Sequence, residues 1–334
     1  MSYSCRQAGP GAAGTGSRSS VRQSSGTRGA LPVWLTPQVR GAATRPRDTA
    51  PMDVRHFADA QAALGVVAEP LGAAGAEGEL SLGLLRRLVD TPDAFGSEVT
   101  MIVGEQDGRP VVFVLMTGDH PAQVAGFADS AEIGFGDLVA AMLDAGRRAP
   151  GVNGARHVSE PFAQAWSEVA GAQVAVRRDL HAFELRVVRP PAVPPGSFRT
   201  ASAGDTVLLE RWTLAFAEDI GETISSQEAS ETVARMLPHG DLAVWERDGE
   251  VVSMAAVVRR TPWSSSVAYV YTPPPLRRRG YASAVVAELS QRELDAGQSW
   301  CSLFTDAANP TSNHIYTEIG YEPRCDFRYL TLTW

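Results

Sequence analysis

The stretch that decides the fold is VYTPPPLRRRGYA, which runs from Val270 to Ala282. The β-branched and aromatic residues that lead into it predict a strand over residues 265–272. Three prolines follow, and the strand must stop pairing there because proline has no N–H to donate to a β-ladder. Apolar residues then recur at helical spacing, which predicts a helix that ends near Ala296 and Gly297.

The first turn of that helix should fall at residues 279–282. Its backbone N–H groups have no intrahelical partner, and together with the positive end of the helix dipole they suit a pyrophosphate. Gly280 has no Cβ to hold a phosphate away, and the small Ala282 leaves the next donor accessible. A solvated basic helix start would look the same, whereas a dinucleotide-binding turn would need three glycines where the chain has one. Three consecutive side chains add positive charge: Arg277, Arg278 and Arg279.

A second motif, NPTSNHIY, follows a predicted strand over residues 299–305. Asn309 stands where an N-cap belongs, and Pro310 takes the first helical position, where its missing N–H costs nothing. Gly320 is suited to end the helix. Asn309 and Tyr316 are seven residues apart, about two turns, so they should share one face. A core tyrosine with a satisfied hydroxyl is the alternative interpretation of Tyr316.

The two motifs together, R-x-x-G-x-A after a proline-terminated strand and then N-x6-Y-x3-G-Y, resemble the GNAT superfamily of N-acetyltransferases. The resemblance covers about residues 198–334 and is most specific over residues 270–321. It implies an α/β fold with a central mixed, twisted sheet flanked by helices, and acetyl-coenzyme A held between two splayed parallel strands. Ala282 departs from the commonest pattern, which has glycine there. The resemblance implies cofactor contacts from Val270, Tyr271, Thr272, Arg277, Arg278, Arg279, Gly280, Tyr281, Ala282, Asn309 and Tyr316.

The resemblance also implies a reaction, in which a primary amine attacks the thioester carbonyl directly and a backbone N–H faces the oxyanion. Tyr316 would give its proton to the leaving thiolate. An alkyl amine has a pKa near ~10.4, so a base must take its proton at neutral pH. Glu218, Asp219 and Glu222 are the candidates for that base. A solvated acidic loop is an equally simple interpretation of these carboxylates, and water could serve in their place.

Composition bounds the remaining possibilities. The net charge of −8 over 334 residues does not favour a nucleic-acid surface, and no apolar run is long enough to span a bilayer. Cys5, Cys301 and Cys325 offer neither a disulfide framework nor metal-ligand spacing, so we expect a reducing cytoplasm and no metal. The expected partner is a small-molecule or peptide amine, and the chain could be a monomer or a homodimer.

Residues 1–51 differ from the rest, with seven arginines, one acid and many Gly, Ser, Thr and Pro residues. Such a segment cannot bury enough apolar surface to order itself, so we expect a disordered extension. An Arg- and Ser-rich, acid-poor segment also resembles a mitochondrial transit peptide, although its amphipathicity is poor. Folded character begins after Met52, which could be the translation start.

The length predicts two domains, and residues 53–188 show the element order of residues 198–334. Asp137 opens a helix where phosphate would dock, and Trp166 falls near the place of the tyrosine. We therefore expect a degenerate, non-catalytic copy that packs on the second, joined by a stiff proline-rich linker at residues 189–197. An unrelated α/β domain is the alternative. In this copy we predict helices at 57–67, 80–88, 135–147 and 160–170, and strands at 99–105, 111–117, near Val152 and up to Val188.

Three functions are compatible with the sequence. An acetyl-CoA-dependent N-acetyltransferase is favoured, with one competent site in residues 198–334. A non-catalytic acyl-CoA-binding or sensor protein is the alternative, and the presence of Tyr316 argues against it. A basic nucleotide or RNA binder that uses Arg277–Arg279 fits poorly with the overall acidity and the lack of interleaved aromatic residues. The acceptor amine is not identified by any motif.

Overall fold

The computed structural model describes residues 52–96 and 98–334. The predictions for residues 1–51 lie outside this part of the chain. We call residues 53–188 the N-terminal half and residues 197–334 the C-terminal half. The N-terminal half contains β1 (Asp53–Phe57), α1 (Ala60–Ala73), α2 (Ala76–Asp90), β2 (Val99–Gln106), β3 (Arg109–Thr117), β4 (Ala122–Gly126), α3 (Phe135–Asp144), β5 (Gly151–Ala155), α4 (Arg156–Ala170) and β6 (Gln173–Leu185).

The C-terminal half repeats this order of elements after an extended segment over residues 189–196. It begins with a short strand and two helices, and ends with a helix followed by a long strand. Its elements are β7 (Ser197–Thr200), α5 (Thr206–Asp219), α6 (Ser226–Met236), β8 (Leu242–Arg247), β9 (Glu250–Arg260), β10 (Ser264–Tyr271), α7 (Tyr281–Asp295), β11 (Trp300–Asp306), α8 (Pro310–Ile319) and β12 (Glu322–Thr333).

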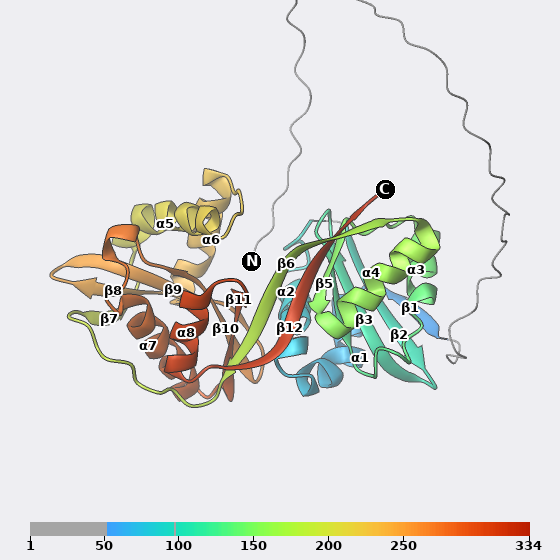
Figure 1. Ribbon diagram of the computed structural model, residues 1–334, viewed down its shortest axis with the longest axis horizontal. Coiled ribbons are helices and arrows are strands. Elements are labelled where there is room, and N and C mark those ends of the chain that lie inside the picture. The colour runs from blue at the N-terminus through green and yellow to red at the C-terminus, as the bar shows by residue number, and fades with distance from the viewer. Residues whose placement is uncertain (1–51, 97) are drawn as a thin grey trace, which may run out of the picture. The chain divides into compact units, whose positions relative to one another are not determined.

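All described strands form one twelve-stranded mixed sheet in the order β1-β2-β3-β4-β5-β12-β6-β11-β10-β9-β8-β7. Among these described strands, only β4–β5 and β10–β11 pair in parallel. The last strands of the two halves are exchanged, since β6 pairs with β11 while β12 pairs with β5. β6 and β12 also pair with each other along nearly their whole length, side by side in Figure 1. Each half therefore depends on a strand of the other to complete its sheet.

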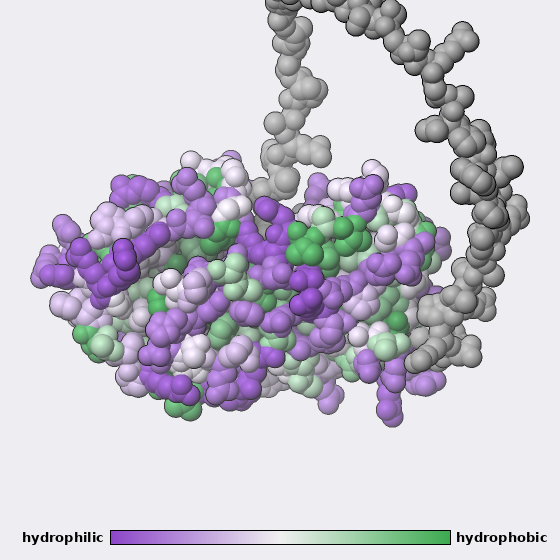
Figure 2. All heavy atoms as spheres, viewed as in Figure 1, coloured by the Kyte–Doolittle hydropathy of each residue, from purple (hydrophilic) through white to green (hydrophobic). Residues whose placement is uncertain are grey.

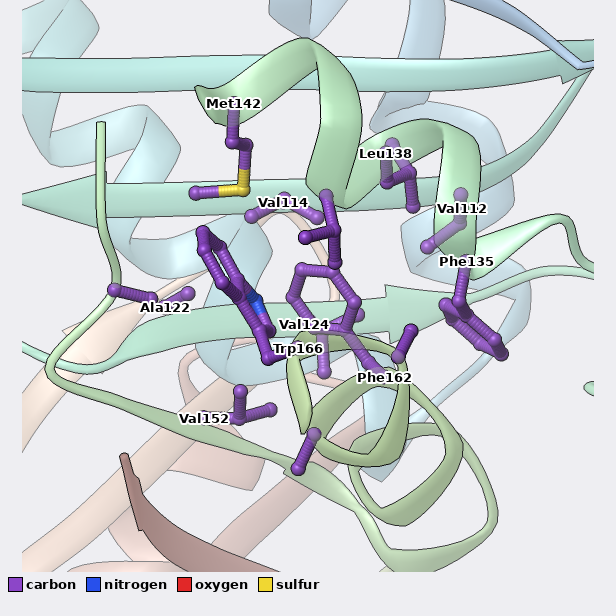
Figure 3. Close-up of a cluster of buried hydrophobic side chains, with 14 of the residues drawn as sticks. Val112, Val114, Ala122, Val124, Phe135, Leu138, Met142, Val152, Phe162 and Trp166 are labelled. Atoms are coloured by element: carbon purple, nitrogen blue, oxygen red, sulfur yellow. The ribbon is translucent and has the colours of Figure 1, made fainter. Parts of the chain in front are cut away.

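Alternation along the strands builds a core on each face of the sheet. In the N-terminal half, Phe113 and Leu115 pack with α1 and α2, while Val112 and Val114 pack with α3 and α4. Figure 3 shows the second of these clusters, in which Phe162 and Trp166 of α4 lie against the sheet. In the C-terminal half, α5 and α6 cover one face, and α7 and α8 cover the other.

The α/β fold class predicted from the sequence is confirmed, and most predicted elements are present within a few residues of their expected bounds. The sequence prediction missed β1 and β4. It also ended the first helix too early, because α1 continues through Pro70 to Ala73. The N-cap of α1 is Asp59, whose side chain accepts hydrogen bonds from the amides of Gln61 and Ala62. The proposed domain boundary at residues 189–197 stays a prediction, because the strand exchange crosses it.

Candidate functional site

The parallel pair β10–β11 opens partway along its length. Its pairing runs from Ser264 with Trp300 to Val267 with Leu303, whereas β10 continues to Tyr271 and β11 to Asp306. Beyond that point β11 pairs on its other side with β6. The facing edges of the two strands are thereby left apart, and we call the space between them the slot.

A β-bulge holds β10 in this shape. The pairing of β10 with β9 shifts register between Ala268 and Tyr271, and Tyr269 has a φ of 52°. A bulky residue with positive φ is a backbone outlier, and such strain is retained mostly at functional sites. The bulge turns the edge of β10 away from β11 and so keeps the slot open.

A pocket of about 560 Å³ lies at the slot. The bulged segment of β10 and Phe304 of β11 form one side of it, and Tyr316 of α8 lines it as well. The segment that joins α5 to α6 contributes Ile220, Glu222 and Ile224. The pocket therefore collects groups from both faces of the sheet.

Tyr316 is buried, with 8% of its surface exposed. Phe183 and Tyr321 pack around its ring, with centroid separations of 6.4 Å and 6.0 Å. Burial raises the pKa of the Tyr316 hydroxyl well above its usual range, because the phenolate would lose its hydration. The Tyr316 hydroxyl is therefore protonated at neutral pH.

Of the three carboxylates predicted as bases, only Glu222 lines the pocket. Glu218 is exposed, and Asp219 forms an ion pair with Arg277. The base roles of Glu218 and Asp219 stay predictions, and neither side chain is among those that line the pocket. Burial raises the pKa of Glu222, and the neighbouring cation of Arg178 opposes that rise.

Arg178 is a site residue that sequence reasoning missed. Its Nη1 donates to Glu222 Oε1 at 3.2 Å, and its Nη2 donates to the Ile220 carbonyl at 2.6 Å. The Arg178 and Glu222 side chains are only 12% and 13% exposed. Arg178 lies on β6, the strand that the N-terminal half contributes to the sheet of the other half. No local pattern relates it to a residue 44 positions later.

The start of α7 has the predicted form, with Gly280 as N-cap at a φ of 83°. The first helical amide bonded to backbone is that of Ala284, which donates to the Gly280 carbonyl at 3.0 Å. The amides of Tyr281 and Ala282 precede it and have no carbonyl within the helix. Gly280 itself is exposed, so the first-turn donors can be approached from solvent.

The three arginines before Gly280 differ in their contacts. Arg277 donates from Nε to the Thr272 carbonyl at 2.8 Å, in addition to its ion pair with Asp219. Arg279 donates to the Pro275 carbonyl at 3.1 Å. Arg278 is exposed and has a φ of 61°. The guanidinium of Arg277 is thus held by the protein, while Arg278 faces solvent.

The other residues predicted to contact the cofactor also differ in their surroundings. Val270 lines the pocket. The Tyr271 ring packs on Trp212 with centroids 5.7 Å apart, and the Tyr271 carbonyl accepts from Ser253 Oγ at 3.1 Å. The Thr272 side chain is bonded to Ser253, and its carbonyl to Arg277. The Tyr281 hydroxyl accepts a hydrogen bond from Arg247 Nη1 at 3.0 Å.

Asn309 caps α8 as predicted, and its Oδ1 accepts from the Ser312 amide at 3.1 Å. It is exposed and lies outside the lining of the pocket, in contrast to Tyr316 on the same helix. The structure therefore gives Asn309 a capping role, and its predicted contact with a pantetheine arm stays a prediction.

The N-terminal half has no corresponding slot among its described residues. β4 pairs with β3 in regular register, and α4 begins directly after β5. Val158 of α4 packs so closely on the end of β4 that a Cβ at Gly126 would lie 2.8 Å from it. Trp166 is fully buried beside Phe162, with ring centroids 6.3 Å apart (Figure 3). The protein's own side chains fill this region, and Asp137 lies in the first turn of α3.

The part of the chain that the structure describes contains no group of three or more His, Cys, Asp or Glu side chains placed to hold a metal ion. Cys301 and Cys325 are free thiols. None of the described helices is both long and apolar enough to cross a membrane. The face shown in Figure 2 is largely hydrophilic, with apolar residues scattered across it.

Residues 246–330 match the family model described as FR47-like protein, a segment that includes the slot, the start of α7 and Tyr316. No curated protein matches the chain by sequence. The structure is similar to a GCN5-related N-acetyltransferase from Sphaerobacter thermophilus, with a TM-score of 0.57 and 17% identity over 84% of this chain and 94% of that chain. It is also similar to an acetyltransferase of the GNAT family from Colwellia psychrerythraea, with a TM-score of 0.53 and 11% identity over 84% and 98% of the two chains.

A third similar structure is a tandem GNAT protein from the clavulanic acid biosynthesis pathway, with a TM-score of 0.50 and 12% identity over 84% of this chain and 98% of its own. At these identities the likeness concerns the fold. The described chain thus has the fold of the GNAT acetyltransferases, and its similarity to a tandem member extends over both halves.

The Arg178–Glu222 pair predicts a pH-dependent loss of stability in Arg178→Met. The variant leaves Glu222 buried without its cation, which should cost about 3 kcal/mol at pH 8. A raised carboxyl pKa favours the folded state below the usual carboxyl range, and this benefit is lost as pH rises through the raised pKa. The loss should therefore be much smaller at pH 5. Urea unfolding at both pH values measures it, with exposed Arg109→Met as the control, because Arg109 does not act on the Glu222 pKa. Equal losses of unfolding free energy at pH 5 and pH 8 would contradict the conclusion that Arg178 stabilises the buried Glu222 carboxylate.

Proposed function

We propose that this protein is an acyl-coenzyme A-dependent N-acyltransferase with one active site, in the C-terminal half, and that acetyl is the group it transfers. The observation that carries the proposal is the slot itself, in which a bulged strand edge, a buried protonated tyrosine and a carboxylate share one pocket. Each has a possible role in transfer from a thioester to an amine, because the strand edge can hold the thioester arm, the tyrosine can protonate the leaving thiolate, and the carboxylate can accept the amine proton.

The residues present fit a coenzyme A thioester. The start of α7 offers unpaired amides and the exposed Gly280, where a Cβ would meet nothing closer than 3.8 Å. That leaves room for a diphosphate at the positive end of the helix dipole. Beyond Val267 the edge of β10 does not pair with β11, so a pantetheine arm could pair with this edge at Val270, as an added strand would. We assign the diphosphate to residues 278–283 and the arm to the segment around Val270.

The proposed reaction is a direct transfer. The amine nitrogen forms a bond to the thioester carbonyl carbon, the carbon–sulfur bond breaks, and the thiolate takes a proton from Tyr316. The amine proton passes to Glu222, directly or through water. A backbone N–H of the bulged segment would stabilise the negative charge on the carbonyl oxygen. Glu222 is suited to its role because burial raises its pKa and a more basic carboxylate accepts a proton more readily.

A non-catalytic acyl-CoA-binding protein is the alternative function. It would require the slot and the proposed diphosphate site at residues 278–283, which we call the diphosphate cradle. It would not require a protonated tyrosine in the same pocket as a carboxylate. The buried position of Tyr316 therefore supports the enzyme. The acceptor is an amine of small-molecule or peptide type, and both a monomer and a homodimer are compatible with the proposal.

Tyr316→Phe tests the proposed acid. Loss of the hydroxyl should lower kcat by about 10² to 10⁴, the usual contribution of a general acid, with little change in the affinity for acetyl-CoA. Thiol release with the most active amine of a panel measures the rate. The matched control is Tyr321→Phe, whose hydroxyl bonds to Ser290 at 2.8 Å. An unchanged kcat in Tyr316→Phe would exclude this role.

Gly280→Glu tests the diphosphate cradle. The added carboxylate would repel a diphosphate and cover the first-turn amides, so we expect at least ~100-fold weaker acetyl-CoA binding in calorimetry. Gly297→Glu is the matched control, because Gly297 follows the other end of α7, has a φ of 101° and has open space around it. If both variants bind acetyl-CoA like the unmodified protein, the cradle is misplaced.

A further inference from the structure

A second, larger pocket of about 820 Å³ lies between the two halves. The N-terminal half contributes side chains from α2, β3, β4 and β5, and the C-terminal half contributes Val258, Arg259 and Ser266. Three further lining residues also line the pocket at the slot, namely Val267, Ala268 and Phe304. The two pockets are therefore adjacent at the point where β10 and β11 separate. We call the larger one the inter-half pocket.

The inter-half pocket opens on one particular face of the sheet. Leu115, which lines it, packs in the core formed with α1 and α2. Val258 and Ala268, on its other side, pack against the core formed with α5 and α6. The α7 helix covers the opposite face. A molecule in this pocket would reach the slot from the face opposite the proposed diphosphate cradle, without competing for the same space.

The walls are mostly apolar. They are formed by Leu80, Leu84, Phe95, Leu115, Leu180 and Phe304. No carboxylate side chain lines the pocket among the described residues. The one guanidinium, that of Arg259, is already held by buried Glu79 at 3.2 Å and by Ser266 Oγ at 2.7 Å. A second positive charge on a ligand would therefore be desolvated here without a partner, which is unfavourable.

Two buried side-chain atoms of residues that line the pocket have no hydrogen-bond partner among the described residues, namely Arg259 Nε and Asn153 Oδ1. Of these two, Asn153 Oδ1 is the acceptor. Asn153 is 6% exposed, and its Nδ2 donates to Gln123 Oε1 at 2.7 Å. Gln123 in turn donates to the Pro121 carbonyl at 3.1 Å. Asn153 Oδ1 has no hydrogen-bond partner among the described residues. Buried polar atoms in folded proteins are normally bonded, so this oxygen calls for a donor from a ligand.

We propose that the inter-half pocket binds the acceptor, and that the acceptor is a small monoamine. Its body is aromatic or branched aliphatic and carries one neutral hydrogen-bond donor, a hydroxyl or an amide N–H, that meets Asn153 Oδ1. That the bound amine is the acceptor of the acyl group rests on the proposed acyltransferase function. Binding of the amine to the pocket does not depend on that function. Polyamines and peptide lysines fit the pocket less well, because each brings additional charge or bulk.

Calorimetric titration of the full chain with tyramine, 2-phenylethylamine and spermidine tests the proposal. Tyramine has the hydroxyl, 2-phenylethylamine lacks it, and spermidine carries extra charges. We expect tyramine to bind about tenfold more tightly than 2-phenylethylamine, and spermidine to bind least. Asn153→Leu should remove the difference between the two aromatic amines. Leu84→Trp, which fills the pocket from α2, should weaken both at least ~10-fold.

Leu143→Trp is the matched control, a half-buried leucine on α3 outside this pocket, and thermal unfolding verifies that each variant folds. Absence of amine binding, preference for spermidine, or unchanged tyramine binding in both Leu84→Trp and Asn153→Leu would overturn the proposal. A separate acetyl-CoA titration distinguishes the failures. If acetyl-CoA binds and no amine does, only the pocket proposal fails. If acetyl-CoA does not bind, the proposed function fails, and the amine titrations still decide the pocket.

Discussion

The rest of the site depends on the point at which two parallel strands stop pairing. β10 and β11 are hydrogen-bonded as far as Val267 and Leu303, and the bulge at Tyr269 prevents the ladder from continuing. Unpaired backbone edges inside a protein are costly, because each buried N–H or C=O needs a partner. Our proposal takes the strand edge left open in the middle of this sheet as a position for a ligand that completes it.

The N-terminal half shows what the same architecture becomes without that opening. Its parallel pair β4–β5 is short and regular, and α4 starts at once and packs Val158 onto the end of β4. Its contribution to the site is made instead through the sheet. β6 carries Arg178 to Glu222, and the walls of the inter-half pocket come largely from α2 and β3 to β5. The N-terminal half, which lacks a slot among its described residues, thus contributes side chains to the site of the C-terminal half.

Local signals in the sequence gave the elements around the slot correctly. Gly280, Asn309 with Pro310, and Gly320 lie at the ends of α7 and α8 because their backbone requirements are local. Tyr316 lines the pocket, whereas Asn309, predicted to share its face of the helix, does not. β4 was missed because Ala122 to Gly126 is short and carries small residues, so it has no strong strand pattern. The first helix was predicted to end at residue 67, whereas α1 continues through Pro70 to Ala73.

Contacts between residues far apart in the chain could not be predicted from the sequence. The exchange of β6 and β12, and with it the pairing of Arg178 to Glu222, depends on strand order, which no local pattern specifies. Likewise, nothing in the sequence distinguished Glu222 from Glu218, since only the turn after α5 directs one inward and the other to solvent. Thr272 and Arg277 were both predicted to contact the cofactor. In the structure the Arg277 side chain donates to the Thr272 carbonyl, a contact that the sequence did not predict.

Hydrogen exchange of the full chain, with and without saturating acetyl-CoA, tests most directly the claim that the slot is a cofactor position. The account predicts new protection of the backbone amides in residues 268–272 and 278–283, and no change in the corresponding residues 125–137 of the N-terminal half. Unchanged exchange at residues 268–283, or equal protection of both halves, would contradict it.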